Sequence, residues 1–351
     1  MTINAAVLGA TGYVGGELLR LIAAHPTFDL AAAVSSSRSG EPVAAVFPHL
    51  AASCADTQFS KPGEWIGALE RGSRLALFSA APHAASASVI AQVIEDASKR
   101  DLELHVVDSS ADFRYSSADS FQEVYGSPHP APELLGEFVC AVPEHLSNTD
   151  SGNVGHPGCF ATAILLGSMP LVATGIIDGE LFVSGITGST GSGRSPQAGT
   201  HHPERHSNLY AYKPLSHRHV PEVENLLRAG SKTGTQVNFI PHSGPFARGI
   251  YVTTQARLSV TLTEVELREK LTEFYADAPF VQVVSGTPRL KDVVASNYCQ
   301  LGVAVDGDNV VVMSAIDNLV KGAAGGALQW MNRLWSLPET TGLTATAPAW
   351  T

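Results

Sequence analysis

The chain has 351 residues, of which 44% are hydrophobic and 16% charged, so it is long enough for two domains that each bury a core. Its net charge of −11 argues against a general affinity for nucleic acid or for acidic membrane surfaces. The four cysteines lie far apart and form no C-x-x-C pair, which predicts neither a disulfide framework nor a zinc knuckle. We find no export signal and no membrane-spanning run, and therefore expect a cytoplasmic protein.

The first third alternates short apolar runs with amphipathic stretches. This alternation is typical of a parallel sheet covered by helices. The predicted strands and helices are Ile3–Gly9, Tyr13–Ala24, Leu30–Val34, Leu75–Ser79, Ser86–Ser98 and His105–Asp108.

From about Leu181 the predicted strands are longer and alternate apolar with polar residues, which indicates an antiparallel sheet with one buried face. These strands are Gln236–Ile240, Ile250–Val260, Leu301–Val305 and Val310–Ala315. Thr263 and Glu266 form the pattern of a capping box and predict a helix through Tyr275. A last apolar helix is expected from Asn318 to Trp335.

A glycine-rich turn, Gly9-Ala10-Thr11-Gly12-Tyr13-Val14-Gly15, lies between the first predicted strand and helix. Glycines there let the backbone approach a pyrophosphate, and the helix N-terminus supplies N–H donors. The acidic residue that usually binds the ribose after the second strand is missing, and Ser35–Ser39 stands in its place. Ser36 and Arg38 suit a 2′-phosphate, so NADP is favoured over NAD. The alternative is an exposed loop that binds no phosphate, because such a loop can have the same serines and arginine.

The segment Gly155-His156-Pro157-Gly158-Cys159-Phe160-Ala161-Thr162 places one cysteine at the start of a predicted helix, Ala161–Met169. Free N–H groups and the positive end of the helix dipole favour the thiolate at such a position. Cys159 is therefore the candidate nucleophile. The alternative is a buried structural cysteine after a Pro-Gly turn.

Three further segments place an arginine beside a loop rich in hydrogen-bond donors, as anion binding requires. They contain Arg114, Arg194 and Arg248. Hairpin turns are the alternative for the last two, and an ion pair with Asp112 is the alternative for the first.

His217 and His219 would share one face if their segment were extended, and imidazole is well matched to proton transfer near neutral pH. A zinc site formed by these residues with the histidines at 201, 202 or 206 matches no known ligand spacing, so no metal is expected. Structural histidines are the other interpretation.

The chain resembles the N-acetyl-gamma-glutamyl-phosphate reductases, an NADPH-dependent family of arginine biosynthesis. The family pattern runs as G-A-[ST]-G-Y-x-G, P-G-C-[YF]-x-T, G-x-S-G-x-G-R, H-R-H-x-P-E, P-x-x-R-G-I and N-L-x-K-G. All six segments occur here in that order, from the Gly9 turn to Gly322. The third reads Gly188-Ser189-Thr190-Gly191, a conservative change, and His156 stands where the family often has Asn.

The resemblance implies a role for each matching residue. It makes Cys159 the acyl-accepting thiol and gives the acid/base role to the pair of His217 and His219, of which we favour His219. The implied cofactor contacts are Gly9, Thr11, Gly12, Tyr13, Val14, Gly15, Ser36, Arg38, Ser192, Gly193 and Asn318. The implied substrate contacts are Arg114, for the substrate phosphate, and Arg194, Arg248 and Glu222.

The implied reaction is the reduction of N-acetyl-L-glutamyl 5-phosphate to N-acetyl-L-glutamate 5-semialdehyde through a thioester on Cys159. Aspartate-semialdehyde dehydrogenase and aminoadipyl-phosphate reductase share this chemistry and are the alternatives within the class. A non-catalytic dinucleotide-binding sensor is the alternative outside it. Such a sensor would keep the Gly9 turn but would need neither the cysteine nor the histidine pair.

The expected fold is α/β, with a Rossmann-type NADP-binding domain over 1–155 and 318–351. An α+β catalytic and oligomerisation domain with a mainly antiparallel sheet is expected over 156–317. The expected partners are the acyl-phosphate substrate, phosphate and further copies of the chain in a homodimer or homotetramer. Nucleic acid and membrane are not expected partners.

Overall fold

The computed structural model describes residues 2–147, 149–177, 179–231 and 234–349. The chain forms two compact units. Unit 1 comprises Met1–Ala141, Asn148–His156 and Ala323–Thr344, and unit 2 comprises Val142–Ser147, Pro157–Gly322 and Ala345–Thr351. This division assigns 142–147, 318–322 and 345–351 to unit 2, whereas the sequence boundaries put these stretches in the dinucleotide domain.

Unit 1 contains a seven-stranded sheet in which every neighbouring pair is parallel. The strand order is β3-β2-β1-β4-β5-β7-β6. The strands are β1 Ile3–Leu8, β2 Phe28–Val34, β3 Phe59–Ser60, β4 Arg74–Ser79, β5 Glu103–Asp108, β6 Phe138–Cys140 and β7 Asn153–Gly155. The direction of the strand order reverses between β1 and β4, and in doubly wound sheets ligands bind beside such a switch point.

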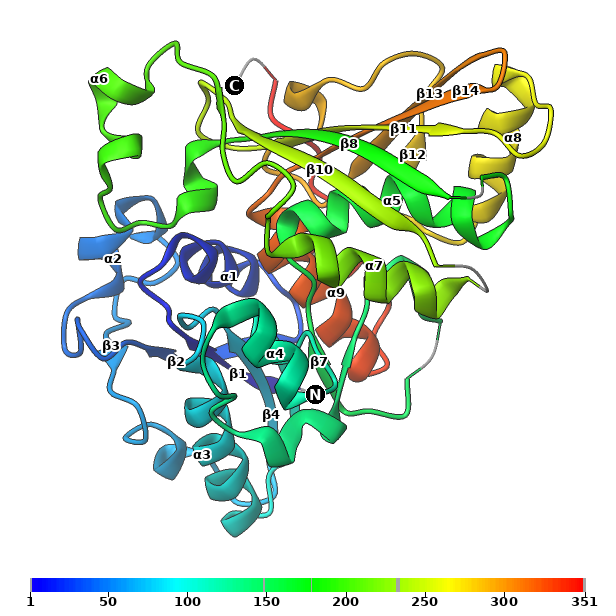
Figure 1. Cartoon of the computed structure of the whole chain (residues 1–351). Coiled ribbons are helices and arrows are strands. Elements are labelled where there is room, and N and C mark those ends of the chain that lie inside the picture. Colours follow the sequence, from blue (N-terminus) through cyan, green and yellow to red (C-terminus); the bar gives the residue numbers. More distant parts are fainter. Residues whose placement is uncertain (1, 148, 178, 232–233, 350–351) are drawn as a thin grey trace. The chain divides into compact units, whose positions relative to one another are not determined.

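The helices of unit 1 are α1 Tyr13–Ala23, α2 Val43–Val46, α3 Ser86–Lys99, α4 Ala118–Tyr125 and α9 Gly325–Leu334. Short 3₁₀ turns cover Pro48–Leu50, Ile66–Ala68 and Pro132–Glu137. The last helix, α9, packs against α1 and β5, although α1 ends at Ala23 and α9 begins only at Gly325 (Figure 1). Trp330 of α9 is fully buried, and its indole N–H donates to Ala141 O at 2.9 Å.

Unit 2 contains a second seven-stranded sheet, in the order β12-β13-β14-β11-β8-β10-β9. Its strands are β8 Glu180–Thr187, β9 Tyr210–Ala211, β10 Gln236–Ser243, β11 Ile250–Arg257, β12 Val281–Val283, β13 Cys299–Asp306 and β14 Asn309–Ile316. The sheet is mixed, because β8 with β10 and β12 with β13 pair in parallel while the other pairs are antiparallel. Buried and exposed residues alternate along β8 and β10, as expected for a sheet with one buried face.

The helices of unit 2 are α5 Cys159–Ala173, α6 His202–Arg205, α7 His219–Gly230 and α8 Glu264–Phe274, with 3₁₀ turns at Pro143–His145, Ser189–Ser192, Ala198–Thr200 and Leu290–Asp292. Figure 1 shows α5 and α7 side by side beneath the sheet, and α5 contacts β11, β13, β14, α7 and α8. Because α5 has neighbours on several sides, it is apolar all round. No helix in the described part of the chain is both long and apolar enough to cross a membrane.

Two sequence predictions about helix ends have different outcomes. The capping box of α8 is present, because Thr263 Oγ1 accepts the Glu266 N–H and the Glu266 carboxylate accepts the Thr263 N–H. The prediction that the last helix starts at Asn318 is wrong. A single π-helical turn, Val320–Ala324, comes first, and regular α-helix begins only at Gly325.

Candidate active site

The glycine-rich turn of unit 1 follows β1 and leads into α1. Gly9 has a φ of +68°, and a Cβ there would lie 2.5 Å from Ala80 O; a Cβ at Gly15 would lie 2.6 Å from Gly9 O. The packing of the turn therefore requires both glycines. Gly12 differs, because its φ is −75° and the nearest atom to an added Cβ would be 3.5 Å away. The protein has room for a side chain at Gly12, so glycine at this helix N-terminus fits close approach by a pyrophosphate.

The other residues expected to contact the cofactor in unit 1 lie around this turn. Thr11 Oγ1 is 3.5 Å from Ser35 Oγ, directly after β2, while Tyr13 and Val14 open α1. Ser36 and Arg38 are exposed beyond Ser35. Arg38 Nη1 is 2.9 Å from Glu41 Oε2. A guanidinium has five N–H groups, so this one ion pair leaves capacity to bind a phosphate.

Cys159 is the first residue of α5 and is partly buried. Gly158 precedes it in an extended conformation, and the first turn of the helix contains no acidic residue. The first N–H groups of any α-helix have no acceptor within the helix, and the dipole adds partial positive charge there. The thiol therefore lies where a thiolate or an oxyanion is stabilised.

Glu222 lies in the first turn of α7 and is buried. Its Oε1 accepts the Gly158 N–H at 2.7 Å. This bond ties the Pro-Gly-Cys turn to α7 and gives Glu222 a clear structural task. Its expected contact with the substrate stays a prediction.

The segment of His217 and His219 is not extended, so that premise of the sequence interpretation is wrong. Arg218 has right-handed helical φ and ψ, and α7 begins at His219. Pro221 falls in the first turn, where the missing N–H of proline costs nothing. The two imidazoles are nevertheless close, with ring centroids 4.7 Å apart.

The two histidines have different surroundings. His217 Nδ1 accepts the backbone N–H of His219 at 3.2 Å, and its ring packs edge-on against Phe160, Tyr212 and Phe239. Burial, reinforced by the charges of Arg218 and Lys213, lowers the pKa of His217 to about 4. His217 is therefore neutral at physiological pH and acts as a hydrogen-bond acceptor at the start of α7.

Tyr212 is a residue of this site that the sequence analysis missed. Like Cys159, it packs at the edge of the unit 2 core, and its ring packs against that of His217. Burial, and then the nearby charge of Cys159, raises the pKa of its phenol, which stays protonated. No sequence motif singles out this tyrosine, because its place depends on the pairing of its N–H with Pro241 O.

Arg114 is held within unit 1 by backbone carbonyls. Its Nε donates to His156 O and its Nη2 to Ser109 O, both at 3.1 Å. His156 is buried and lies three residues before Cys159 in the sequence. The Asp112 carboxylate accepts N–H groups of Ala84 and Ala87 at the start of α3.

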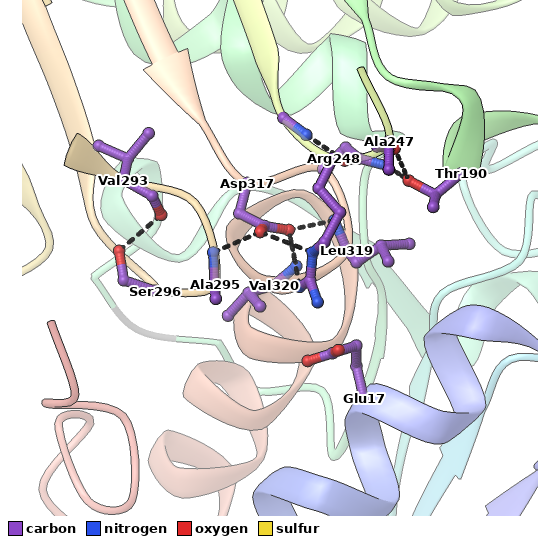
Figure 2. A network of polar contacts seen from close by, with 12 residues as sticks. Glu17, Thr190, Ala247, Arg248, Val293, Ala295, Ser296, Asp317, Leu319 and Val320 are labelled. Atoms are coloured by element: carbon purple, nitrogen blue, oxygen red, sulfur yellow. Dashed lines mark hydrogen bonds and ion pairs between the residues drawn. The ribbon is translucent and has the colours of Figure 1, made fainter. Parts of the chain in front are cut away.

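Arg248 and Asn318 belong to a polar network next to Asp317, of which Figure 2 labels Arg248, Asp317 and Thr190. Arg248 makes a two-point ion pair with the fully buried Asp317, with Nε–Oδ2 3.0 Å and Nη2–Oδ1 3.2 Å. Asn318 Oδ1 accepts the Gly249 N–H at 2.7 Å, and its amide donates to Thr190 Oγ1. This network fixes the turn Ser189–Ser192 relative to the start of β11.

The remaining predicted residues of unit 2 are exposed. Ser192 ends the 3₁₀ turn, Gly193 follows with a φ of +82°, and Arg194 comes next. Across the described residues, no three His, Cys, Asp or Glu side chains come together as metal ligands.

Comparison with known proteins places these features in a class. Residues 4–149 match the model of the semialdehyde dehydrogenase NAD-binding domain, and residues 159–318 match that of the semialdehyde dehydrogenase dimerisation domain. The fold agrees with aspartate semialdehyde dehydrogenase II of Vibrio cholerae, solved with ASA (TM-score 0.68, 14% identity, 96% of this chain and 98% of that one). The Candida albicans aspartate semialdehyde dehydrogenase solved with NADP is similar (TM-score 0.67, 17% identity, 96% and 99%). The chain is thus an oxidoreductase of the semialdehyde dehydrogenase class.

Relatives closer in sequence define the family within this class. The N-acetyl-gamma-glutamyl-phosphate reductase of Methanopyrus kandleri is 40% identical over 96% of both chains. Those of Methanosarcina barkeri and Symbiobacterium thermophilum are 38% and 36% identical over 99% and 100% of this chain, and over the full length of both relatives. The chain belongs to the N-acetyl-gamma-glutamyl-phosphate reductase family.

Proposed function

We propose that this chain reduces N-acetyl-L-glutamyl 5-phosphate to N-acetyl-L-glutamate 5-semialdehyde, with release of phosphate and at the expense of NADPH. The observation that carries the proposal is the placement of Cys159 as the first residue of α5, in the same unit as the pair of His217 and His219. The curated relatives bear the name of this reductase over essentially the whole chain. The aspartate-specific neighbours share only the fold, at 14–17% identity.

The proposed chemistry begins at Cys159. Its thiolate attacks the γ-carbonyl carbon, the new C–S bond forms, and the C–O bond to phosphate breaks to leave a thioester. N–H groups of the first turn of α5 stabilise the oxyanion, an effect worth about 3–4 kcal/mol per donor in other enzymes. NADPH supplies the hydride that reduces the thioester. The C–S bond then breaks, so the aldehyde leaves and the thiolate is restored.

His219 is the proposed acid/base for the proton on the substrate oxygen. It is the first residue of α7, while the neighbouring His217 already accepts the His219 N–H through Nδ1. A neutral His217 with an occupied Nδ1 is suited to positioning. The difference between the two histidines supports His219 as the proton carrier and His217 as the residue that fixes the start of α7.

The proposed cofactor is NADP rather than NAD. The turn at Gly12 suits the pyrophosphate, and Ser36 with Arg38 would bind the 2′-phosphate. Ser192, Gly193 and Asn318 are proposed to contact the cofactor as well. Arg114, Arg194, Arg248 and Glu222 are proposed substrate contacts; for Arg248, the ion pair with Asp317 fixes the plane of the guanidinium.

We further propose that the protein works as a homo-oligomer. Support comes from the family model named a dimerisation domain and from the outer face of the unit 2 sheet. On this face Phe182 of β8 is 55% exposed and Ile240 of β10 is 40% exposed, close together on paired strands. Large apolar side chains grouped on a sheet surface are typical of a protein–protein interface.

The test is phosphate-dependent formation of NADPH from N-acetylglutamate semialdehyde and NADP. Aspartate semialdehyde and NAD serve as the competing substrate and cofactor. We expect activity with the acetylated substrate and NADP, and a loss of several orders of magnitude in Cys159→Ser but not in Cys140→Ser. Preference for aspartate semialdehyde would refute the proposed substrate, and near-normal turnover in Cys159→Ser would refute the thioester.

A further inference from the structure

The π turn that interrupts the expected C-terminal helix is joined to the residues before it by a long backbone bond. The Gly322 N–H donates to Asp317 O at 3.0 Å, five residues back, where an α-helix would use the residue four back. Such turns are uncommon, and many of them occur at functional sites. The contacts of this π turn therefore bear on its role.

Gly322 touches the nucleophile. A Cβ at position 322 would lie 2.7 Å from Cys159 Cβ and 3.1 Å from Cys159 Cα. It would also lie 3.3 Å from Ile316 Cδ1. The backbone of Gly322 thus packs against the base of the side chain that carries the thiol, and only glycine permits this approach.

A buried ion pair holds the neighbouring residue. Lys321 Nζ is 2.5 Å from Glu144 Oε1, and the two side chains are 0% and 1% exposed. The ammonium also lies 5.7 Å from the centre of the Phe280 ring. Removing one partner of such a pair leaves a buried charge without compensation, so the pair strongly restrains the position of the π turn.

The Asp317 carboxylate fixes the beginning of the same turn (Figure 2). Its Oδ1 accepts the N–H groups of Leu319 and Val320 at 2.8 and 3.0 Å, and its Oδ2 accepts the Ala295 N–H. Its ion pair with Arg248 adds a further connection, to the segment before β11. The segment that leads into Gly322 is therefore restrained at Asp317 as well as at Lys321.

We propose that Gly322 is a positioning residue for Cys159. Held by Asp317 and by the pair of Lys321 and Glu144, it fixes the thiol in the orientation that the first turn of α5 stabilises. The proposal rests on the proposed function for the role of the thiol. Its test, however, includes a reactivity that needs neither substrate nor cofactor.

The first experiment compares Gly322→Ala with Gly167→Ala. The control adds the same methyl group to the helix of Cys159, but at an ordinary distance of 3.4 Å from Val312 Cγ1. Iodoacetamide alkylation of Cys159 is followed by peptide mass spectrometry across a pH series, beside kcat and KM. In Gly322→Ala we expect the alkylation midpoint to rise by at least half a pH unit and kcat to fall at least tenfold, with the KM for cofactor within twofold. The control should match wild type.

An unchanged midpoint together with kcat within twofold of wild type, in folded Gly322→Ala, would overturn the proposal. If that variant does not fold, the double variant Lys321→Met with Glu144→Gln tests the positioning role instead. It removes both charges while keeping similar volumes, and it should shift the midpoint and kcat in the same directions. Wild-type values in the double variant would then overturn the proposal. If the wild-type enzyme turns over no semialdehyde, the proposed function fails, whereas the alkylation comparison still tests the positioning role.

Discussion

At the scale of single residues, two histidines two positions apart have different hydrogen-bonding positions. His217 is a buried, neutral acceptor for a backbone N–H, and the structure gives it three aromatic neighbours. His219 shares the burial but supplies the N–H that His217 accepts. Sequence spacing could not separate them, because the distinction arises from where α7 begins.

We predict that His219→Asn lowers kcat at least 100-fold, the usual range for loss of a general acid or base. His217→Asn should cost less than tenfold in kcat, because asparagine can accept the same N–H at a helix start. Steady-state kinetics of both variants, with thermal unfolding as a check of folding, measures the contrast. A larger kcat loss in His217→Asn would reverse the assignment.

A second prediction concerns the glycine-rich turn. Gly12→Ala should raise the dissociation constant of NADPH at least tenfold. It should leave the unfolding temperature nearly unchanged, because the nearest protein atom to the new methyl group, Gly9 O, would be 3.5 Å away. Gly15→Ala should instead destabilise unit 1, because its Cβ would meet Gly9 O at 2.6 Å. Titration calorimetry and thermal unfolding separate the two effects. Unchanged NADPH affinity in Gly12→Ala would remove that turn from the proposed cofactor site.

At the scale of elements, α5 shows how a helix tolerates an internal proline. Pro170 cannot donate the hydrogen bond that Leu166 O would receive in a regular helix. The Tyr275 hydroxyl donates to Leu166 O instead, at 2.7 Å, and His145 Nε2 lies 2.9 Å from the same hydroxyl. A side chain from just beyond α8 thus completes the hydrogen bonding of α5.

Tyr275→Phe should therefore lower the free energy of unfolding by about 1–3 kcal/mol, the cost of leaving a buried acceptor unsatisfied. Adding Pro170→Ala restores a backbone N–H and should recover part of that loss. Urea unfolding of the two single variants and the double variant forms the cycle. Strict additivity would show that the tyrosine does not replace the missing bond.

Elements with a local signal could be predicted from sequence, and those without one could not. The strand patterns, α1, α3 and the capping box at Thr263 all follow from residues close together in the chain. The π turn does not, because Gly322 and Cys159 are 163 positions apart, and Lys321 looks in sequence like a solvated lysine. Its buried partner Glu144 lies outside every motif we recognised.

At the scale of the whole molecule, pH should control stability through buried histidines. Burial lowers the pKa of both His145 and His217 to about 4, from 6.5. The unfolded chain therefore takes up protons at a higher pH than the folded one, so the contribution to stability is complete above pH 6.5 and is lost as pH falls toward 4. Each histidine contributes at most about 3 kcal/mol.

Urea unfolding at pH 7.5, 6 and 5 measures this dependence. His145→Gln should show a shallower loss of stability toward acid pH than wild type, because one of the titrating groups is gone. His206→Gln, which changes an exposed histidine, should keep the wild-type slope. Equal slopes in all three proteins would contradict the role of His145.

The proposed assembly of the chain into an oligomer also concerns the whole molecule. Phe182→Asp should weaken the oligomer, because it places a charge on the proposed apolar interface. Val265→Asp, at an equally exposed apolar residue of α8, should leave assembly unchanged. Sedimentation velocity across a concentration series measures both, and an unchanged mass distribution in Phe182→Asp would exclude that face.

The chain passes repeatedly between its two units, and this limits where it can be cut into fragments. Three stretches belong to each unit and alternate along the sequence, so the chain passes from one unit to the other five times. A fragment cut at the apparent boundary, 157–322, would contain Lys321 but would lose Glu144 and His145. Any exchange of the thiol-bearing unit between relatives must therefore transplant residues 142–147 along with it, as a separate piece of sequence.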